Sequence, residues 1–160
     1  MSADMFLKLD GITGESKDKK HKDEIEVQAM SWGMVQTGTG GSGGGSGTGK
    51  VAIQDITISK YVDSASADLL LKCANGTHIA KGVFVARKAG GENPLEYLKI
   101  TMTEVLIASV SHAGSGGGEL MSETVSLNFG KVEVEYFEQD DKGIGTPKGS
   151  MTWDVKANAK

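Results

Sequence analysis

Residues 132–136 read Val132-Glu133-Val134-Glu135-Tyr136, in which apolar and charged side chains alternate. Successive side chains on a β-strand point to opposite faces, so this stretch can bury one face and expose the other. The same alternation occurs in Glu24-Ile25-Glu26-Val27-Gln28-Ala29 and in Met151-Thr152-Trp153-Asp154-Val155. These three segments therefore predict half-buried strands spread over the whole chain.

Other parts of the chain carry weaker strand patterns. β-Branched residues, which favour strands, are frequent in most of these segments, and glycine-rich turns separate several of them. Many short strands joined by such turns are typical of a sandwich or a barrel, so we expect a mainly β fold. The further predicted strands are residues 5–9, 51–59, 79–87, 95–102, 104–111 and 120–129.

One segment, residues 65–74, predicts a short α-helix. Asp63 and Ser64 can supply an N-cap, and Asn75-Gly76 can end the helix in a left-handed conformation. Residues three and four apart share one face of a helix. The residues expected to face the sheet on this basis are Leu70, Leu71 and Ala74.

Composition limits the possible functions. A chain of 160 residues fits one domain, which we expect to span residues 1–160. The net charge of -4 comes from 17 basic and 21 acidic residues mixed along the chain, so there is no cationic stripe that would bind nucleic acid. The lone Cys73 permits no internal disulfide, and synthesis in a reducing cytoplasm is expected.

The chain shows no targeting or membrane signal. Residues 1–10 alternate apolar and charged side chains, without the basic and apolar regions of a secretory signal peptide. The longest apolar runs fall far short of the roughly 20 residues that cross a bilayer, so we expect no membrane insertion.

Two glycine-rich stretches, residues 38–49 and 114–118, are expected to be loops between strands. Within the first, residues 44–50 match G-x-x-x-x-G-K, the start of a phosphate-binding loop. Val51 then stands where such a loop needs Ser or Thr, and a strand pattern follows instead of a helix. Gly38, Gly40 and Gly43 fit G-x-G-x-x-G, again without a βαβ unit around them. The alternative of a monomeric nucleotide- or sugar-binding β-barrel is therefore weak.

No pattern predicts a catalytic or metal site. His21, His78 and His112 lie far apart and lack metal-ligand spacing, so surface or loop positions are expected for them. Cys73 lies late in the expected helix, away from the N-terminal end that would activate a thiolate. We therefore predict no catalytic residue, no metal site and no cofactor.

An ordered series of short blocks resembles the Hcp family of bacterial type VI secretion over nearly the whole chain. One departure is Ala67, where the family often has proline. The blocks are Met5-Phe6-Leu7-Lys8, Gly14-Glu15-Ser16, His21 with Glu24-Ile25, Ser31-Trp32-Gly33, Lys60-Tyr61 with Asp63, Arg87-Lys88-Ala89-Gly90, Tyr97-Leu98-Lys99-Ile100 and Leu127-Asn128-Phe129.

The resemblance implies a two-sheet β-barrel with one short flanking α-helix. It also implies a non-enzymatic subunit that forms homohexameric rings, and these stack into a tube. In this family the tube lies inside a contractile sheath, is capped by a spike protein and carries effector proteins in its lumen. Secretion through this route requires no signal peptide.

The resemblance also suggests which residues make contacts. Ser31 lies in the Ser-Trp-Gly block, on a strand that in the family lines the tube, so it is a candidate lumen and effector contact. The extended loop at residues 38–50 is expected to help one ring meet the next. The candidates for this stacking contact are Gly38, Thr39, Gly44, Ser46, Thr48 and Lys50.

Overall fold

The computed structural model describes residues 3–38 and 48–160. Ten strands and one helix follow one another along these residues, and all the strand pairs are antiparallel. The elements are β1 (Ala3–Leu9), β2 (Ile25–Val27), β3 (Ala29–Ser31), β4 (Met34–Gly38), β5 (Thr48–Ile53), β6 (Ile56–Tyr61), α1 (Ser66–Asn75), β7 (Ile79–Lys88), β8 (Glu96–Ala113), β9 (Ser122–Gln139) and β10 (Gly145–Asp154).

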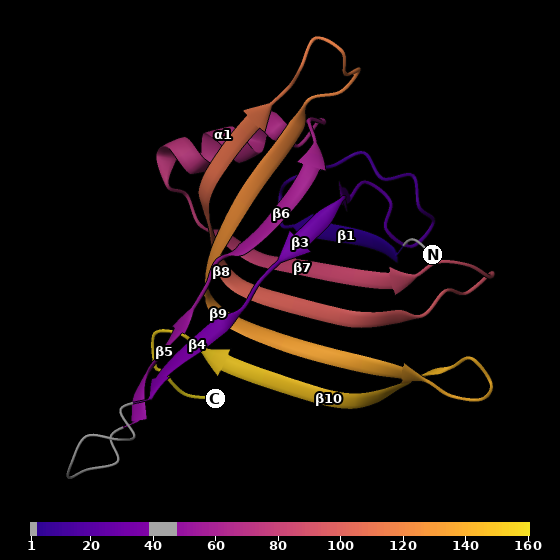
Figure 1. The fold of residues 1–160 in the computed structure, drawn as a ribbon, viewed down its shortest axis with the longest axis vertical. Helices are drawn as coiled ribbons and strands as arrows, with labels where there is room; N and C mark the ends of the chain where they lie inside the picture. Colours follow the sequence, from indigo (N-terminus) through magenta and orange to yellow (C-terminus); the bar gives the residue numbers. More distant parts are fainter. Residues whose placement is uncertain (1–2, 39–47) are drawn as a thin grey trace.

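Eight of these strands form one curled sheet in the order β2-β1-β7-β8-β9-β6-β3, with β10 added along β9. β2 also lies against β6, so the sheet nearly closes into a barrel. β4 and β5 form a separate two-stranded sheet, which extends away from the barrel in Figure 1. The fold is therefore mainly β and barrel-like with one short helix, as the sequence predicted.

The longest strands, β8 and β9, have 18 residues each. The sequence predicted two strands in place of each, with breaks near residues 103 and 130. The structure instead bends β8 within one continuous strand, where Glu104 has a φ of 54° and the register shifts between Ile107 and Ser109. A local bend changes the side-chain pattern as a turn does, which is why the sequence pattern was misread.

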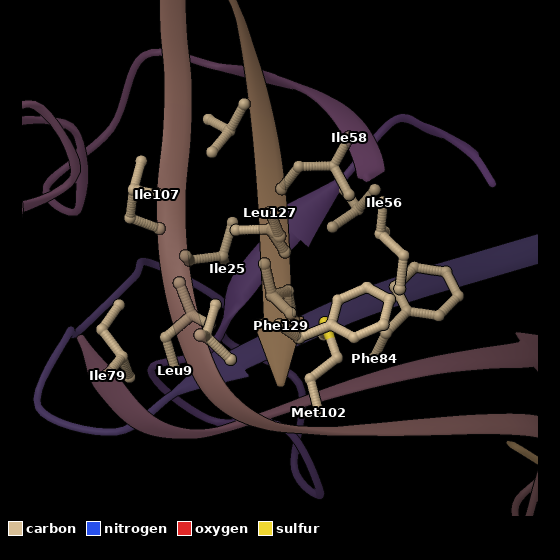
Figure 2. Packing of buried hydrophobic residues seen from close by; sticks show 14 of the residues in the cluster. Leu9, Ile25, Ile56, Ile58, Ile79, Phe84, Met102, Ile107, Leu127 and Phe129 are labelled. Carbon is tan, nitrogen blue, oxygen red and sulfur yellow. The ribbon is translucent and has the colours of Figure 1, made fainter. Parts of the chain in front are cut away.

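The core fills the inside of the curled sheet. Phe84, Met102 and Leu127 are fully buried there, and Figure 2 shows their side chains among those of neighbouring strands. Gly82 allows this packing, because a Cβ at its position would lie 2.9 Å from Cδ2 of Leu9. The alternating residues of the strands supply this interior.

The helix exists where it was predicted, and Gly76 ends it with a φ of 67°. The predicted inner face was wrong. Leu69 is fully buried, whereas Leu70 and Leu71 are 45% and 57% exposed, and Ala74 is also exposed. The sheet meets the face that carries Leu69, and spacing along the helix could not choose between these adjacent faces.

Three other boundaries differ from the predictions. The strand expected at 24–29 is divided at Gln28 into β2 and β3, and the one expected at 51–59 is divided between β5 and β6. β4 was not predicted, and β10 begins six residues before its alternating part. A chain can pass from one strand pairing to another without leaving extended conformation, so these changes leave little local signal.

Candidate interaction surfaces

Ser31 ends strand β3 and is exposed. Its neighbours Met30 and Trp32 are partly buried and pack against the core. The indole Nε1 of Trp32 donates to the carbonyl oxygen of Gln54 at 2.9 Å. This hydrogen bond holds the segment after β3 against the segment before β6. The side chain of Ser31 therefore points to the outer face of the sheet.

The register extends this outer face over four strands. Ser31 lies directly opposite Thr57 on β6. Thr57 lies opposite Ser126 on β9, which in turn lies opposite Ser109 on β8. Residues two apart on a strand share a face, so further hydroxyl groups join the same surface. We call this surface the hydroxyl face; its residues are Ser31, Thr57, Ser59, Ser109, Ser111, Ser122, Thr124 and Ser126.

No ionisable side chain is among these eight positions. Thr57 Oγ1 and Ser126 Oγ are 3.4 Å apart, and the hydroxyl of Ser122 donates to the carbonyl oxygen of Ala113 at 3.1 Å. Asp55, two residues before Thr57, borders this face and accepts a hydrogen bond from Asn128 at 2.9 Å. The eight positions can therefore offer hydroxyl donors and acceptors to a partner, with the carboxylate of Asp55 at their border.

Sequence analysis found Ser31 but missed the rest of the hydroxyl face. A signal was present, because Thr57 and Ser59 alternate with fully buried isoleucines and Thr124 and Ser126 alternate with buried aliphatic residues. Only the register of the four strands shows that these hydroxyl groups form one surface.

A charged row lies on the core side of the same strands. Lys60, Glu123 and His112 are opposite one another on β6, β9 and β8. Lys60 Nζ is 2.6 Å from Glu123 Oε1, both side chains are fully buried, and His112 Nε2 contacts the other carboxylate oxygen. Burial alone would raise the pKa of Glu123. Hydrogen bonds from Lys60 and His112, with the charge of Lys60, outweigh it and hold that pKa below its usual range.

The start of helix α1 is joined to this row. Lys60 Nζ also donates to Asp63 Oδ1 at 2.8 Å, and the hydroxyl of Ser66 donates to Glu123 at 3.1 Å. Asp63 in addition accepts from the backbone N–H of Ala65 at 2.9 Å, while the hydroxyl of Ser64 donates to Thr13. The predicted N-cap was therefore wrong for both residues, because the helix is capped at Ala65 without a side-chain hydrogen bond, and Asp63 fixes only the turn that precedes it. We call the five side chains the Lys60 cluster: Lys60, Asp63, Ser66, His112 and Glu123.

A second charged group, the Arg87 cluster, consists of Arg87, Asp18 and Asp4. The guanidinium of Arg87 is nearly buried and binds Asp18 through two nitrogens, at 3.0 and 2.6 Å, and Asp4 at 3.1 Å. The hydrogen bonds from Arg87 hold the pKa of Asp18 far below its usual range, and they raise the pKa of Arg87. This cluster fastens the loop before β2 to β7 and β1.

The histidines occupy different surroundings. His21 lies in the loop between β1 and β2, one of the two kinds of position predicted, but it is only 6% exposed and stacks on Phe6, with ring centroids 4.3 Å apart. His78 is exposed, and the side chain of His112 is 29% exposed. Within residues 3–38 and 48–160, no group of three or more His, Cys, Asp or Glu side chains could hold a metal ion.

The stacking candidates fall on the β4–β5 hairpin, which we call the arm. Gly38 ends β4, and Thr48 and Lys50 lie in β5. Thr39, Gly44 and Ser46 lie outside the described residues. Lys50 and Val51 belong to a strand, so the helix that a phosphate-binding loop requires does not follow them. Two apolar side chains of the arm, Met34 and Val35, are 41% and 55% exposed.

Comparison with known proteins identifies the class of this fold and surface. Residues 6–136 match the family model described as type VI secretion system effector, Hcp. The chain is 48% identical to Protein hcp1 of Pseudomonas aeruginosa, and the alignment covers 100% of this chain and 99% of that protein.

Solved structures agree with this match. The crystal structure of Hcp1 from Salmonella typhimurium is 44% identical, covers 99% of each chain and has a TM-score of 0.79. A structure described as a type six secretion system protein is 29% identical, covers 98% of each chain and has a TM-score of 0.90. The chain therefore belongs to the Hcp family of type VI secretion proteins.

Hcp proteins are secreted structural components of the type VI system. In the part of the chain that the structure describes, no helix has the length and apolar character needed to span a bilayer.

Proposed function

We propose that this chain is a structural and carrier subunit that closes into a homohexameric ring, and that such rings stack into the inner tube of a type VI secretion apparatus. Membership of the Hcp family supports self-association. The observation that carries the proposal is the hydroxyl face, a polar surface whose eight hydroxyl groups lie on four paired strands. In this proposal residues 1–160 act as one domain without catalytic activity or cofactor.

The hydroxyl face is assigned to the lumen of the ring. Ser31 is exposed on it, and the buried aliphatic residues behind Thr57 and Ser126 hold the wall in place. A lumen of this kind presents hydroxyl groups to an effector protein and does not retain it by strong charge attraction. Binding of cargo is then reversible, as a carrier that releases its cargo requires.

The arm is assigned to the contact between stacked rings. It pairs mainly with itself and extends from the barrel, so exposed side chains such as Met34 and Val35 are available to a neighbouring subunit. An isolated two-stranded hairpin is only marginally stable in water, so contact with another subunit would stabilise the arm. The six stacking candidates predicted from the sequence, from Gly38 to Lys50, remain part of this proposal.

The partners of the proposed tube are the spike protein at its tip, the surrounding contractile sheath and effector proteins in the lumen. The subunit is made in the cytoplasm and leaves through the type VI apparatus without a signal peptide. Nucleic acid and membrane insertion have no part in this function.

Light scattering behind a sizing column tests the ring, with three proteins compared. The wild-type chain should elute with the mass of six protomers. Ser31→Gln should keep that mass, because a polar side chain there meets water, and should reduce co-elution of a cargo effector. A variant without residues 40–47 should also keep the hexamer, because no core residue is removed, and should be secreted less.

Each part of the proposal has its own contradicting result. A wild-type monomer across a wide concentration range would exclude the ring. Loss of the hexamer in Ser31→Gln, with unchanged cargo binding, would place Ser31 in a subunit interface. Normal secretion of the shortened chain would exclude the arm as the stacking contact.

A further inference from the structure

His21 lies between two carboxylates. Its Nδ1 is 2.9 Å from Glu24 Oε2 and its Nε2 is 2.6 Å from Glu96 Oε1. A neutral imidazole has one N–H donor, and an ionised carboxylate only accepts. A neutral ring would therefore direct a nitrogen lone pair at one of the two carboxylates. The imidazolium form donates at both nitrogens and satisfies both contacts.

The surroundings of His21 hold its ring between the two carboxylates. His21 is 6% exposed and stacks on Phe6 with an interplanar angle of 10°. Rotating the ring by half a turn would put Cδ2 and Cε1 where Nδ1 and Nε2 now lie, and both contacts with the carboxylates would be lost. Neither tautomer of the neutral ring can therefore complete the arrangement.

The bridge joins segments that are distant in the sequence. Glu24 immediately precedes β2, and Glu96 begins β8, 75 residues after His21. The other charged groups at this place are already paired, because Arg87 over the Phe6 ring binds Asp18, whose carboxylate also accepts from the His21 backbone N–H. A protonated His21 is then the positive charge that lies between Glu24 and Glu96.

We propose that His21 is a proton-dependent clip, which ties the loop between β1 and β2 to the start of β8 while its imidazole carries two protons. The clip is closed while both ring nitrogens donate, and loss of either ring proton opens it. The side chain of Glu96 is 36% exposed, whereas that of Glu24 is 14% exposed. Release is therefore expected on the Glu96 side, where the carboxylate can turn to water.

Three backbone hydrogen bonds in the loop between β1 and β2 can show whether the clip is closed. Gly14 N–H donates to Asp23 O at 2.7 Å, Ser16 N–H to Glu24 O at 3.0 Å, and Asp23 N–H to Ser16 O at 2.8 Å. Gly14 has no room for a side chain, because a Cβ there would lie 2.5 Å from Glu24 O. Opening of the loop must break these amide hydrogen bonds, so their hydrogen exchange measures whether the clip is closed.

The test combines ¹⁵N NMR of the histidine rings with hydrogen exchange from about pH 6 to about pH 8.5, a range in which histidines commonly titrate. At the lower pH, the His21 ring should show the two equivalent ¹⁵N shifts of an imidazolium. As it deprotonates, protection factors of the Gly14, Ser16 and Asp23 amides should fall about tenfold, the effect of losing one charge-assisted hydrogen bond. His21→Gln should show the lower protection at every pH. His78→Gln, which changes an exposed histidine, should behave as the wild type.

A His21 ring with one proton throughout this range would overturn the proposal, and so would a pH-dependent loss of protection that persists in His21→Gln. If His21→Gln does not fold, the ¹⁵N spectra of the His21 ring in the wild-type chain still test whether the ring carries two protons when the clip is closed.

Discussion

The Lys60 cluster and the Arg87 cluster join loops to the same sheet, but they meet water differently. The side chains of Lys60 and Glu123 have no exposed surface. Arg87 is nearly buried, yet its partners Asp4 and Asp18 are 46% and 23% exposed. Exposed partners can be solvated when the pair is broken, whereas an enclosed partner cannot. Similar hydrogen bonds should therefore have unequal importance for stability.

The largest effect is expected from Glu123→Gln, which leaves the Lys60 ammonium buried with Asp63 as its remaining acid partner. The free energy of unfolding should fall by about 3 kcal/mol, as for other buried pairs that lose one member. Urea denaturation followed by circular dichroism measures this change. The double variant Lys60→Met, Glu123→Leu removes both charges and should lose less than the single variant. An equal or larger loss in the double variant would mean that packing, and not the unpaired charge, sets the cost.

A smaller effect is expected from Arg87→Met. Asp18 and Asp4 can turn to solvent when Arg87 is removed, so the loss should be about 1.5–2 kcal/mol, the lower part of the range for hydrogen bonds to a charged group. Arg87→Lys keeps the charge but not the planar fork that binds Asp18 through two nitrogens, so it should recover only part of the loss. The same urea experiment measures both variants. A loss in Arg87→Met as large as that in Glu123→Gln would remove the distinction between the clusters.

The smallest effect is a difference in acid sensitivity. The pKa of Asp18 is depressed in the folded state, so its contribution is present above the unfolded carboxyl pKa of about 4 and is lost as the pH falls below it. The lowered pKa of Glu123 acts in the same direction. Arg87→Met should flatten the decline in unfolding free energy between about pH 5 and pH 3, while the Glu123 part of the decline persists. If the pH dependence of the unfolding free energy is unchanged in Arg87→Met, Arg87 is not what lowers the pKa of Asp18.

Local sequence patterns predicted much of the fold. The β class, the position of α1 and its end at Gly76 all follow from alternation, spacing and turn chemistry within a few residues. The errors at Leu70 and Leu71 and the breaks predicted in β8 and β9 have one origin. Local spacing shows that a side is apolar or that the chain changes direction, but not what packs against it.

The sequence by itself determined the strand-rich composition, the lack of a nucleic-acid-binding charge pattern and the resemblance to the Hcp family. Only the tertiary structure decided that Lys60 meets Glu123, 63 residues away, and that His21 lies between Glu24 and Glu96. It also aligned Ser31 with Thr57 and its neighbours into one hydroxyl face. These outcomes depend on which strands pair and in which register. Burial of the whole core selects that register, and no short segment contains it.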